Sequence, residues 1–294
     1  MLDYLQFVLA PQMVTGLSLG VAVVLVALGL TIIFGLLDVI NMSHGEFYAV
    51  GAYFALSLGA LGVNFWLLLL LVPALMIPIG FAVERGLIQR VFNSPDRHVA
   101  TLLLTFGLGI VLEDLLSLIY GPNTQRPPTP IRGAVEIFGI MLPNYRLFLI
   151  LFGLFIVGAV ALVVYRTRLG AMVRAAAYDR NMAASLGVPV KTVFAGAFAF
   201  GIALAGLAGV LLSPIYSVFP TMGRDFILLA FTVVIVGGMG SIVGAVVAGL
   251  GLTQIQAISS LYISPVWSDP IVFGILVVVL MVRPQGLFGR LGRA

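Results

Sequence analysis

One polar stretch, residues 166–191, reads RTRLGAMVRAAAYDRNMAASLGVPVK and interrupts an otherwise apolar sequence. Apolar runs of membrane-spanning length lie on both sides of it, and it carries five of the fifteen basic residues with a single acid, Asp179. The alanine-rich composition of 170–186 favours a helix, and Gly187 followed by Pro189 is typical of a helix C-terminus. The sequence therefore predicts a short, capped helix at a membrane surface, between two spans.

This polar stretch has two interpretations. It could be a solvated connecting loop that only obeys the positive-inside rule, or it could be a docking helix for a cytoplasmic partner. A connection needs only a few polar residues to reverse direction, whereas the segment 166–191 is much longer than that and has the features of an ordered, capped helix. We therefore favour the docking helix.

The composition of the whole chain indicates a membrane protein. Of its 294 residues, 61% are hydrophobic and only 9% are charged, and the mean hydropathy is +1.18. A soluble fold could not bury so much apolar surface, so we predict an all-α, polytopic transmembrane bundle in a single domain, 1–294. The net charge of +4 lies in short loops and does not indicate nucleic-acid binding, and the absence of cysteine excludes disulfides and thiol chemistry.

Apolar runs of about 20 residues, long enough to cross a bilayer, define the predicted membrane segments. Single spans are predicted at 13–37, 46–62, 64–83, 99–119, 147–165, 192–212 and 266–282. Together with the apolar run 226–257 they give about eight membrane segments, with broken or re-entrant helices among them. They form an N-terminal half, 13–119, and a C-terminal half, 147–282, joined by a proline-rich external loop, 120–146.

Basic residues predict the orientation. The number of predicted membrane crossings between them places most of the basic residues on the same side of the membrane, which by the positive-inside rule is the cytoplasmic side. They are Arg85, Arg90, Arg97, the basic residues of 166–191, and the tail residues Arg283, Arg290 and Arg293. The N-terminus is then outside and the C-terminus cytoplasmic. No basic segment or cleavage site precedes the first apolar run, so we expect that span to stay in the mature protein.

The apolar run 226–257 must enter and leave by the outer face, because the flanking segments 213–225 and 258–265 are both predicted to be external. Its two legs, about 15 residues each, are short for full crossings. The sequence GGMGS at 237–241 marks the turn between them. We therefore predict a re-entrant or broken-helix hairpin.

A second interruption lies in the N-terminal half, where the polar sequence DVINMSHGE at 38–46 separates two apolar runs. One interpretation is a cytoplasmic turn in which Ser43 caps the next helix and Glu46 is the acid of a capping box. The other is a gate or substrate path, because paired glycine-interrupted segments often line such paths in transporters. The candidate path residues are Asn41, Ser43, His44 and Glu46 here, and Gly238, Gly240 and Ser241 in the hairpin.

Small residues recur at four-residue spacing in several of the predicted spans. Examples are Gly16 with Gly20, and Gly201 with Ala205 and Gly209. This spacing is typical of helix faces that pack closely together in membranes.

No enzymatic constellation is present in the sequence. The two histidines, His44 and His98, lack metal-ligand spacing, and the only lysine, Lys191, is not part of a phosphate-binding loop. We therefore expect no catalytic residue, no metal and no cofactor on this chain, with any ATP hydrolysis carried out by a separate polypeptide. The adjacent acids Glu113 and Asp114 could be interfacial, or they could face an ion path.

Three motifs resemble the permease subunits of branched-chain amino acid ABC importers, of the LivH type. NMSHGE at 41–46 is similar to the N-terminal signature of that family, and RAAAYDRNMAASLG at 174–187 is similar to its cytoplasmic coupling segment. VGGMGSIVGA at 236–245 is similar to its late glycine-rich span. The three motifs occur in the family's order and cover both halves of the chain.

The resemblance implies a permease of the bacterial inner membrane, embedded in lipid, that carries leucine, isoleucine and valine, or urea and short amides. It also implies a second, related permease, cytoplasmic ATPase subunits and an external substrate-binding protein as partners. The ATPase contact would lie around Arg174, Asp179, Arg180, Leu186 and Gly187. The alternative is an ion-coupled secondary transporter or channel that works through intramembrane acids without an ATPase.

Overall fold

The computed structural model describes residues 5–92, 94–137 and 139–289, and Arg290 and Arg293 of the predicted basic tail lie outside them. The N-terminal half contains η1 (Leu5–Leu9), α2 (Ala10–Leu37), α3 (His44–Ala60), α4 (Phe65–Val83), η2 (Glu84–Ile88), α5 (Gln89–Val91) and α6 (Arg97–Tyr120). Two strands follow, β1 (Ala134–Ile137) and β2 (Ile140–Pro143). The C-terminal half contains α7 (Asn144–Arg166), α8 (Arg168–Tyr178), α9 (Arg180–Ser185), α10 (Val190–Leu212), α11 (Met222–Gly237), α12 (Ile242–Tyr262), η3 (Pro265–Trp267) and α13 (Ser268–Val282).

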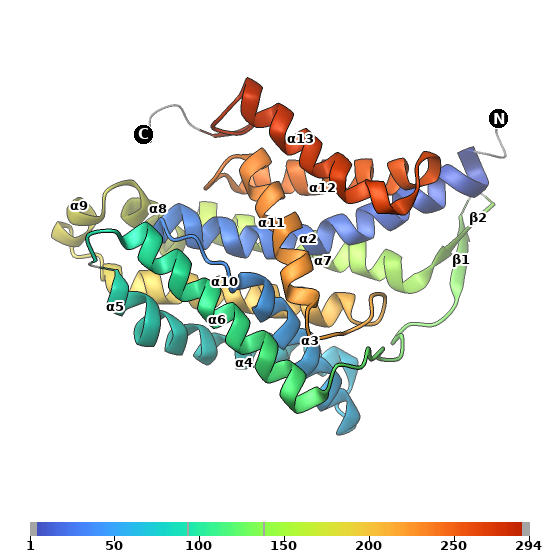
Figure 1. Ribbon diagram of the computed structural model, residues 1–294, viewed down its shortest axis with the longest axis horizontal. Helices are drawn as coiled ribbons and strands as arrows, with labels where there is room; N and C mark the ends of the chain where they lie inside the picture. Colours follow the sequence, from blue (N-terminus) through green and yellow to red (C-terminus); the bar gives the residue numbers. More distant parts are fainter. Residues whose placement is uncertain (1–4, 93, 138, 290–294) are drawn as a thin grey trace.

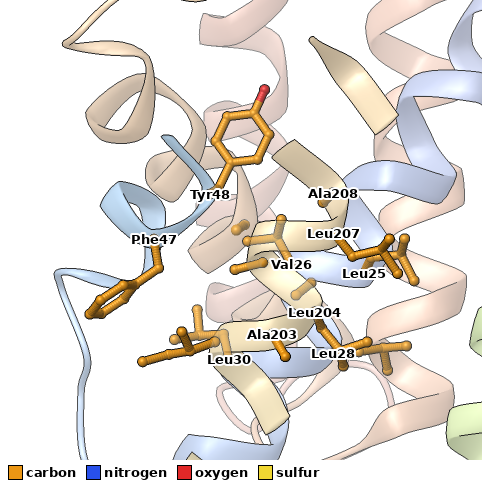
Figure 2. Close-up of a cluster of buried hydrophobic side chains, with 14 of the residues drawn as sticks. Leu25, Val26, Leu28, Leu30, Phe47, Tyr48, Ala203, Leu204, Leu207 and Ala208 are labelled. Carbon is orange, nitrogen blue, oxygen red and sulfur yellow. The ribbon is translucent and has the colours of Figure 1, made fainter. Parts of the chain in front are cut away.

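Two apolar helices, α2 and α10, form the centre of the bundle and are its most buried long helices. Buried side chains from α2, α3 and α10 belong to one hydrophobic cluster there, and Figure 2 labels Leu25, Phe47 and Leu204 among them. Lipid tails are as apolar as these side chains, so close packing rather than transfer from water holds membrane helices together. The core is accordingly rich in small residues that let helix backbones approach.

Glycines make these central contacts tight. A Cβ added to Gly29 or Gly201 would overlap the backbone of the other residue, and one added to Gly51 would overlap the backbone of Gly206. The predicted packing role of the small residues of α10 is confirmed. The predicted role of Gly16 is confirmed as well, because that glycine packs against Ala257 of α12.

The remaining long helices surround this centre and leave apolar side chains exposed. α12 runs along α2, α4 packs on α10, and α7 packs on α2, while α6 is the least buried of the long helices. In the described part of the chain, six helices are long and apolar enough to cross a membrane. The helices α3, α11 and α13 are shorter, so the total of about eight membrane segments stays a prediction.

The bundle has two distinct ends (Figure 1). The strands β1 and β2 lie beside the start of α2 at one end, which we call the hairpin end after this β-hairpin and not after the α11–α12 hairpin. The helices α5, α8 and α9 lie at the opposite end, which we call the coupling end. β1 and β2 pair antiparallel, with Ala134 opposite Pro143. This short sheet lies in the segment predicted only as an extended loop, and a bridge between Gln125 and Val218 ties the loop to the chain before α11.

The glycine-rich hairpin differs in part from its prediction. The turn between α11 and α12 falls at Gly238–Ser241, as predicted. α11 is short, with 16 residues, but α12 has 21 residues, so the prediction of two short legs is wrong for the second. α12 continues past the apolar run because its polar end packs on polar residues of α2, where Gln12 Nε2 donates to Ser260 Oγ at 2.8 Å.

Candidate functional site

The break between α2 and α3 reaches into the bundle. α2 ends at Leu37 because Asp38 has a left-handed backbone conformation, with φ 53°. Residues 38–43 then return along α2, since Nε2 of His44, the first residue of α3, lies 3.1 Å from the carbonyl oxygen of Val26. At the helical rise of about 1.5 Å per residue, Val26 lies roughly 16 Å before the end of α2. The interpretation of this segment as a surface turn is therefore wrong.

Polar side chains of the break are buried: Asn41, Ser43, His44 and Glu46. The Ser43 hydroxyl donates to Oδ1 of Asn41 at 2.7 Å and does not cap α3, so the predicted capping box is wrong. Thr105 of α6 holds the segment in place. Its Oγ1 lies 3.1 Å from the carbonyl oxygen of Ile40 and 3.1 Å from the backbone nitrogen of Met42.

Several of these side chains have unpaired atoms. Among the described residues, Nδ2 of Asn41, Nδ1 of His44 and Oε2 of Glu46 are buried without a hydrogen-bond partner. Folded proteins pair nearly all buried polar atoms, and transporters commonly form their substrate sites where helices break inside the membrane. Unpaired donors and acceptors collected at such a break make 41–46 the strongest candidate for a substrate path.

The carboxylate of Glu46 faces the start of α11. A Cβ added to Gly223 would overlap this carboxylate, so no side chain separates it from the α11 backbone. The next residue, Arg224, forms an ion pair with Glu113 of α6 at 2.6 Å, and the Glu113 side chain is only 13% exposed. Asp114 is exposed. Glu113 thus has a basic partner from another helix, which lowers the cost of burying its charge.

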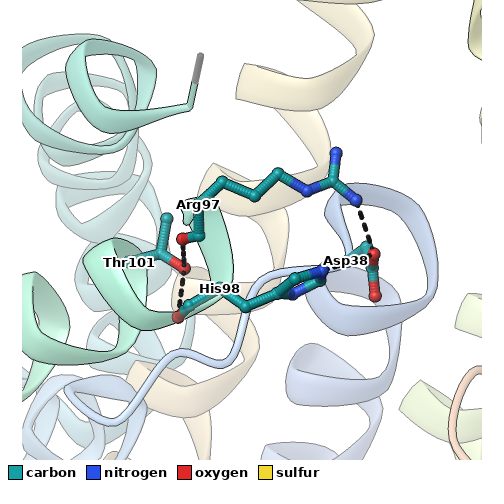
Figure 3. A network of polar contacts seen from close by, with 4 residues as sticks. All are labelled: Asp38, Arg97, His98 and Thr101. Carbon is teal, nitrogen blue, oxygen red and sulfur yellow. Dashed lines mark hydrogen bonds and ion pairs between the residues drawn. The ribbon is translucent and has the colours of Figure 1, made fainter. Parts of the chain in front are cut away.

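At the coupling end, Asp38 connects α2 to α6. Its Oδ2 lies 2.6 Å from a guanidinium nitrogen of Arg97 and 3.5 Å from Nε2 of His98 (Figure 3). Thr101 donates to the carbonyl oxygens of Arg97 and His98. The start of α6 is therefore attached to the point where α2 ends.

Arg180 links the same region to α9. Its guanidinium carbon lies 4.4 Å from the ring centroid of Phe92 and 4.6 Å from that of Phe194, and Arg97 lies over Phe92 at 5.6 Å. Burial, and then repulsion from Arg97, lower the pKa of Arg180, while Asp38 raises it. Cation–π contacts thus join α9 to α10 and to the segment before α6.

The docking helix predicted over 170–186 is in fact two helices, α8 and α9. The backbone is extended at Asp179, whose carboxylate accepts a hydrogen bond from the backbone nitrogen of Met182 at 2.9 Å and caps α9. Aspartate favours such a cap over a helix interior, which explains the break. The predicted end is confirmed: α9 stops at Ser185, and Gly187 has a positive φ of 83°.

The segment 166–191, which contains α8 and α9 and which we call the coupling segment, exposes apolar side chains together with its charges. These are Leu169, Tyr178, Met182 and Leu186. Arg174 instead donates to the backbone carbonyl oxygen of Val164, at the end of α7. Apolar groups gathered on an otherwise polar surface are typical of protein contact sites.

The second group of candidate path residues lies in the α11–α12 turn. Gly238 and Gly240 have positive φ angles, and Ser241 caps α12 by accepting from the backbone nitrogen of Gly244 at 3.1 Å. Gly240 lies against Gly35, near the end of α2. The turn is therefore at the coupling end, and the two predicted groups of path residues lie at different depths.

Sequence reasoning did not predict the partners that other helices supply to these sites. They are Phe92, Arg97, Thr105, Phe194 and Arg224. Phe194 is in α10, the helix that follows α9, whereas the other four come from elements distant in sequence from the residues that they contact; none belongs to a local motif. No signal within a single sequence marks such residues.

Long apolar helices around a buried helix break define the class of this chain as a polytopic helical membrane protein of the transport type. The sequence profile of the family described as "Branched-chain amino acid transport system / permease component" matches residues 12–281. The chain belongs to this family.

Curated relatives agree with the family match. The chain is 33% identical to the high-affinity branched-chain amino acid transport system permease protein LivH of Salmonella typhimurium, over 95% of each chain. It is 30% identical to the corresponding protein BraD of Pseudomonas aeruginosa, also over 95% of each chain. A more distant relative is LivM of Escherichia coli K12, with 27% identity over 92% of this chain and 68% of LivM. The chain is thus a multi-pass permease subunit of an importer.

Proposed function

We propose that this permease forms part of the path for branched-chain amino acids, or related small amides, across the bacterial inner membrane. The observation that carries the proposal is the α2–α3 break, where buried polar atoms of Asn41, His44 and Glu46 lack partners inside the bundle. The names of its relatives support the substrate class, since LivH and BraD are branched-chain amino acid permeases. The path would pass the break, with Ser43 and Asn41 beside it.

ATP hydrolysis belongs, in this proposal, to separate cytoplasmic subunits that dock on α8 and α9. Docking would involve Arg174, Asp179, Arg180, Leu186 and Gly187. The exposed apolar side chains of this segment support it, with Leu186 77% exposed. A second permease related to LivM and an external substrate-binding protein complete the assembly, and this chain itself holds no cofactor or metal.

The orientation follows from the docking surface. The coupling end would face the cytoplasm, with the C-terminus inside and the N-terminus outside. The basic residues of 166–191 support this orientation through the positive-inside rule. The hairpin end, with β1 and β2, would then face the substrate-binding protein.

Movement at the docking surface would reach the path through Arg180. This side chain stacks on Phe92 and Phe194, and Phe92 also contacts Arg97, which pairs with Asp38 at the start of the break. ATP binding that displaced α9 would therefore pull on the segment that carries Asn41 to Glu46. ATP binding would shift the permease between its inward-open and outward-open states only to the extent that these two states differ in their affinity for the ATPase.

A reconstitution experiment separates this proposal from an ion-coupled transporter. The chain would be placed in proteoliposomes with its partner permease, ATPases and binding protein, and leucine uptake would be measured with ATP supplied on the ATPase side. We expect uptake only in the complete assembly. Uptake by this chain alone, driven by a proton or sodium gradient, would refute the ATP-driven proposal.

A further inference from the structure

A cavity of about 320 Å³ with a mixed polar and apolar lining lies at the hairpin end, between the start of α2, the end of α12 and the start of α13. Its polar lining includes Gln12, Thr15, Tyr216, Gln256, Ser268 and Asp269. The cavity is separate from the α2–α3 break and contains none of the path residues named above. Its volume is at the lower end of the range for small-molecule sites, about 300–1,000 Å³.

Two residues of the wall have buried oxygens without partners. Ser268 is 6% exposed, and neither its Oγ nor the Oε1 of Gln256 has a hydrogen-bond partner among the described residues. Nε2 of Gln256 donates to Oδ1 of Asp269 at 2.7 Å. Gln256 therefore lies beside a carboxylate, and Ser268 is the residue that precedes Asp269 in α13. The three residues line the same cavity, and each has an oxygen that can accept a hydrogen bond.

This acceptor group matches one kind of ligand. A primary ammonium carries three N–H donors and a positive charge. The exposed Asp269 carboxylate can accept from it directly, and Gln256 Oε1 and Ser268 Oγ, which are buried in the wall, would accept from it once their side chains turn toward the cavity. At the opposite wall, Arg146 donates to Oγ1 of Thr15 and brings a positive charge behind the lining. Leu19 adds apolar surface to the same cavity.

We propose that the cavity binds a free α-amino acid. Its ammonium lies on Asp269, Gln256 and Ser268, its carboxylate lies toward Thr15 and Arg146, and its aliphatic side chain packs on Leu19. This inference rests on the proposed function, because the occupant is the transported amino acid on arrival at the outer mouth of the permease. The Asp269 carboxylate in one wall and the Arg146 guanidinium behind Thr15 have opposite charges, and together they select a zwitterion over an uncharged amide.

Photo-leucine, the diazirine analogue of leucine, tests the site directly in the complete assembly embedded in nanodiscs. After irradiation, mass spectrometry should find the label on peptides that contain 12–19 or 256–269. Excess L-leucine should remove this labelling, whereas N-acetyl-L-leucine, which lacks the ammonium, should not. Label that is absent from both peptides, or equal competition by the two compounds, would overturn the proposal.

Substitution tests the ammonium contact. Asp269→Asn should reduce labelling at a fixed photo-leucine concentration by about tenfold, as expected for loss of a charged hydrogen-bond acceptor. Ser268→Ala should reduce it less. Asp114→Asn is the matched control, because it also converts an exposed carboxylate to an amide but lies outside the cavity. Equal labelling of the Asp269 and Asp114 variants would contradict the assignment.

A lipid headgroup with a primary ammonium is the other possible occupant. Nanodiscs of phosphatidylcholine with and without phosphatidylethanolamine distinguish the two. Free leucine as the ligand predicts equal labelling in both, whereas labelling lost on addition of phosphatidylethanolamine would overturn the proposal. Leucine uptake by the wild-type assembly is measured in parallel. Normal uptake without labelling of the cavity would overturn only the binding site, whereas absence of uptake would overturn the proposed transport function.

Discussion

Asp38 shows how much one residue can determine in this fold. Among the described residues it is the only one other than glycine with a positive φ. Aspartate tolerates this conformation better than most residues, and its carboxylate is also the partner of Arg97. One side chain therefore ends a 28-residue helix, directs the chain back into the bundle and fixes the start of α6.

The contact between Glu46 and Gly223 gives a prediction at the same scale. Gly223→Ala would place a methyl group on the Glu46 carboxylate, the end of a flexible but buried side chain that would have to move. We therefore expect a loss of about 1 kcal/mol in stability, the lower end of the range for overpacked sites. Thermal unfolding of the purified assembly in mild detergent would measure it.

Matched controls make the Gly223 result specific. Gly158→Ala should have little effect, because a Cβ there meets no atom within 4 Å. In a Glu46→Ala background, Gly223→Ala should cost much less, since the overlapping carboxylate is gone. The same cost in both backgrounds would show that the strain lies elsewhere.

The elements that could be predicted from sequence are the membrane-spanning helices and the turns and helix ends marked by glycine. Long apolar runs predicted the spans, and glycines predicted the 238–241 turn and the end of α9. The inward start of α3 could not be predicted, because it depends on contacts of His44 with Val26 and of Thr105 with the break. The β1–β2 pair was missed because its short strands lie in a proline-rich loop.

The exposed side chain of Leu186 in the coupling segment gives a prediction about ATPase docking. Leu186→Glu should weaken docking of the ATPase, because it replaces an exposed apolar contact with a charge. Pull-down of the tagged permease in mild detergent should recover several-fold less ATPase. Leu61→Glu is the matched control, since Leu61 is 80% exposed and Leu186 is 77% exposed. Equal recovery from both variants would place the ATPase contact elsewhere.

At the scale of the whole molecule, the two ends should lie on opposite sides of the membrane. The chain contains no cysteine, so an introduced cysteine is the only thiol on this chain that a maleimide can label. Met239→Cys, in the α11–α12 turn, and Thr129→Cys, in the loop before β1, both replace exposed residues.

Labelling with a membrane-impermeant maleimide checks this arrangement. We expect Thr129→Cys to react in intact cells and Met239→Cys to react only in inverted membrane vesicles. Reaction of both from the same side would contradict the orientation, and reversed reactivity would place the C-terminus outside.

The bare backbone contacts of α10 determine how the permease can move. α10 touches α2 at Gly29 and Gly201 and touches α3 at Gly51 and Gly206, with no side chain between the chains to absorb a displacement. These three helices must therefore travel as a single stiff block. Switching between inward-open and outward-open forms would then occur by sliding at the looser boundaries of this block, and α13, which packs on α11 and α12, is among the helices that would move.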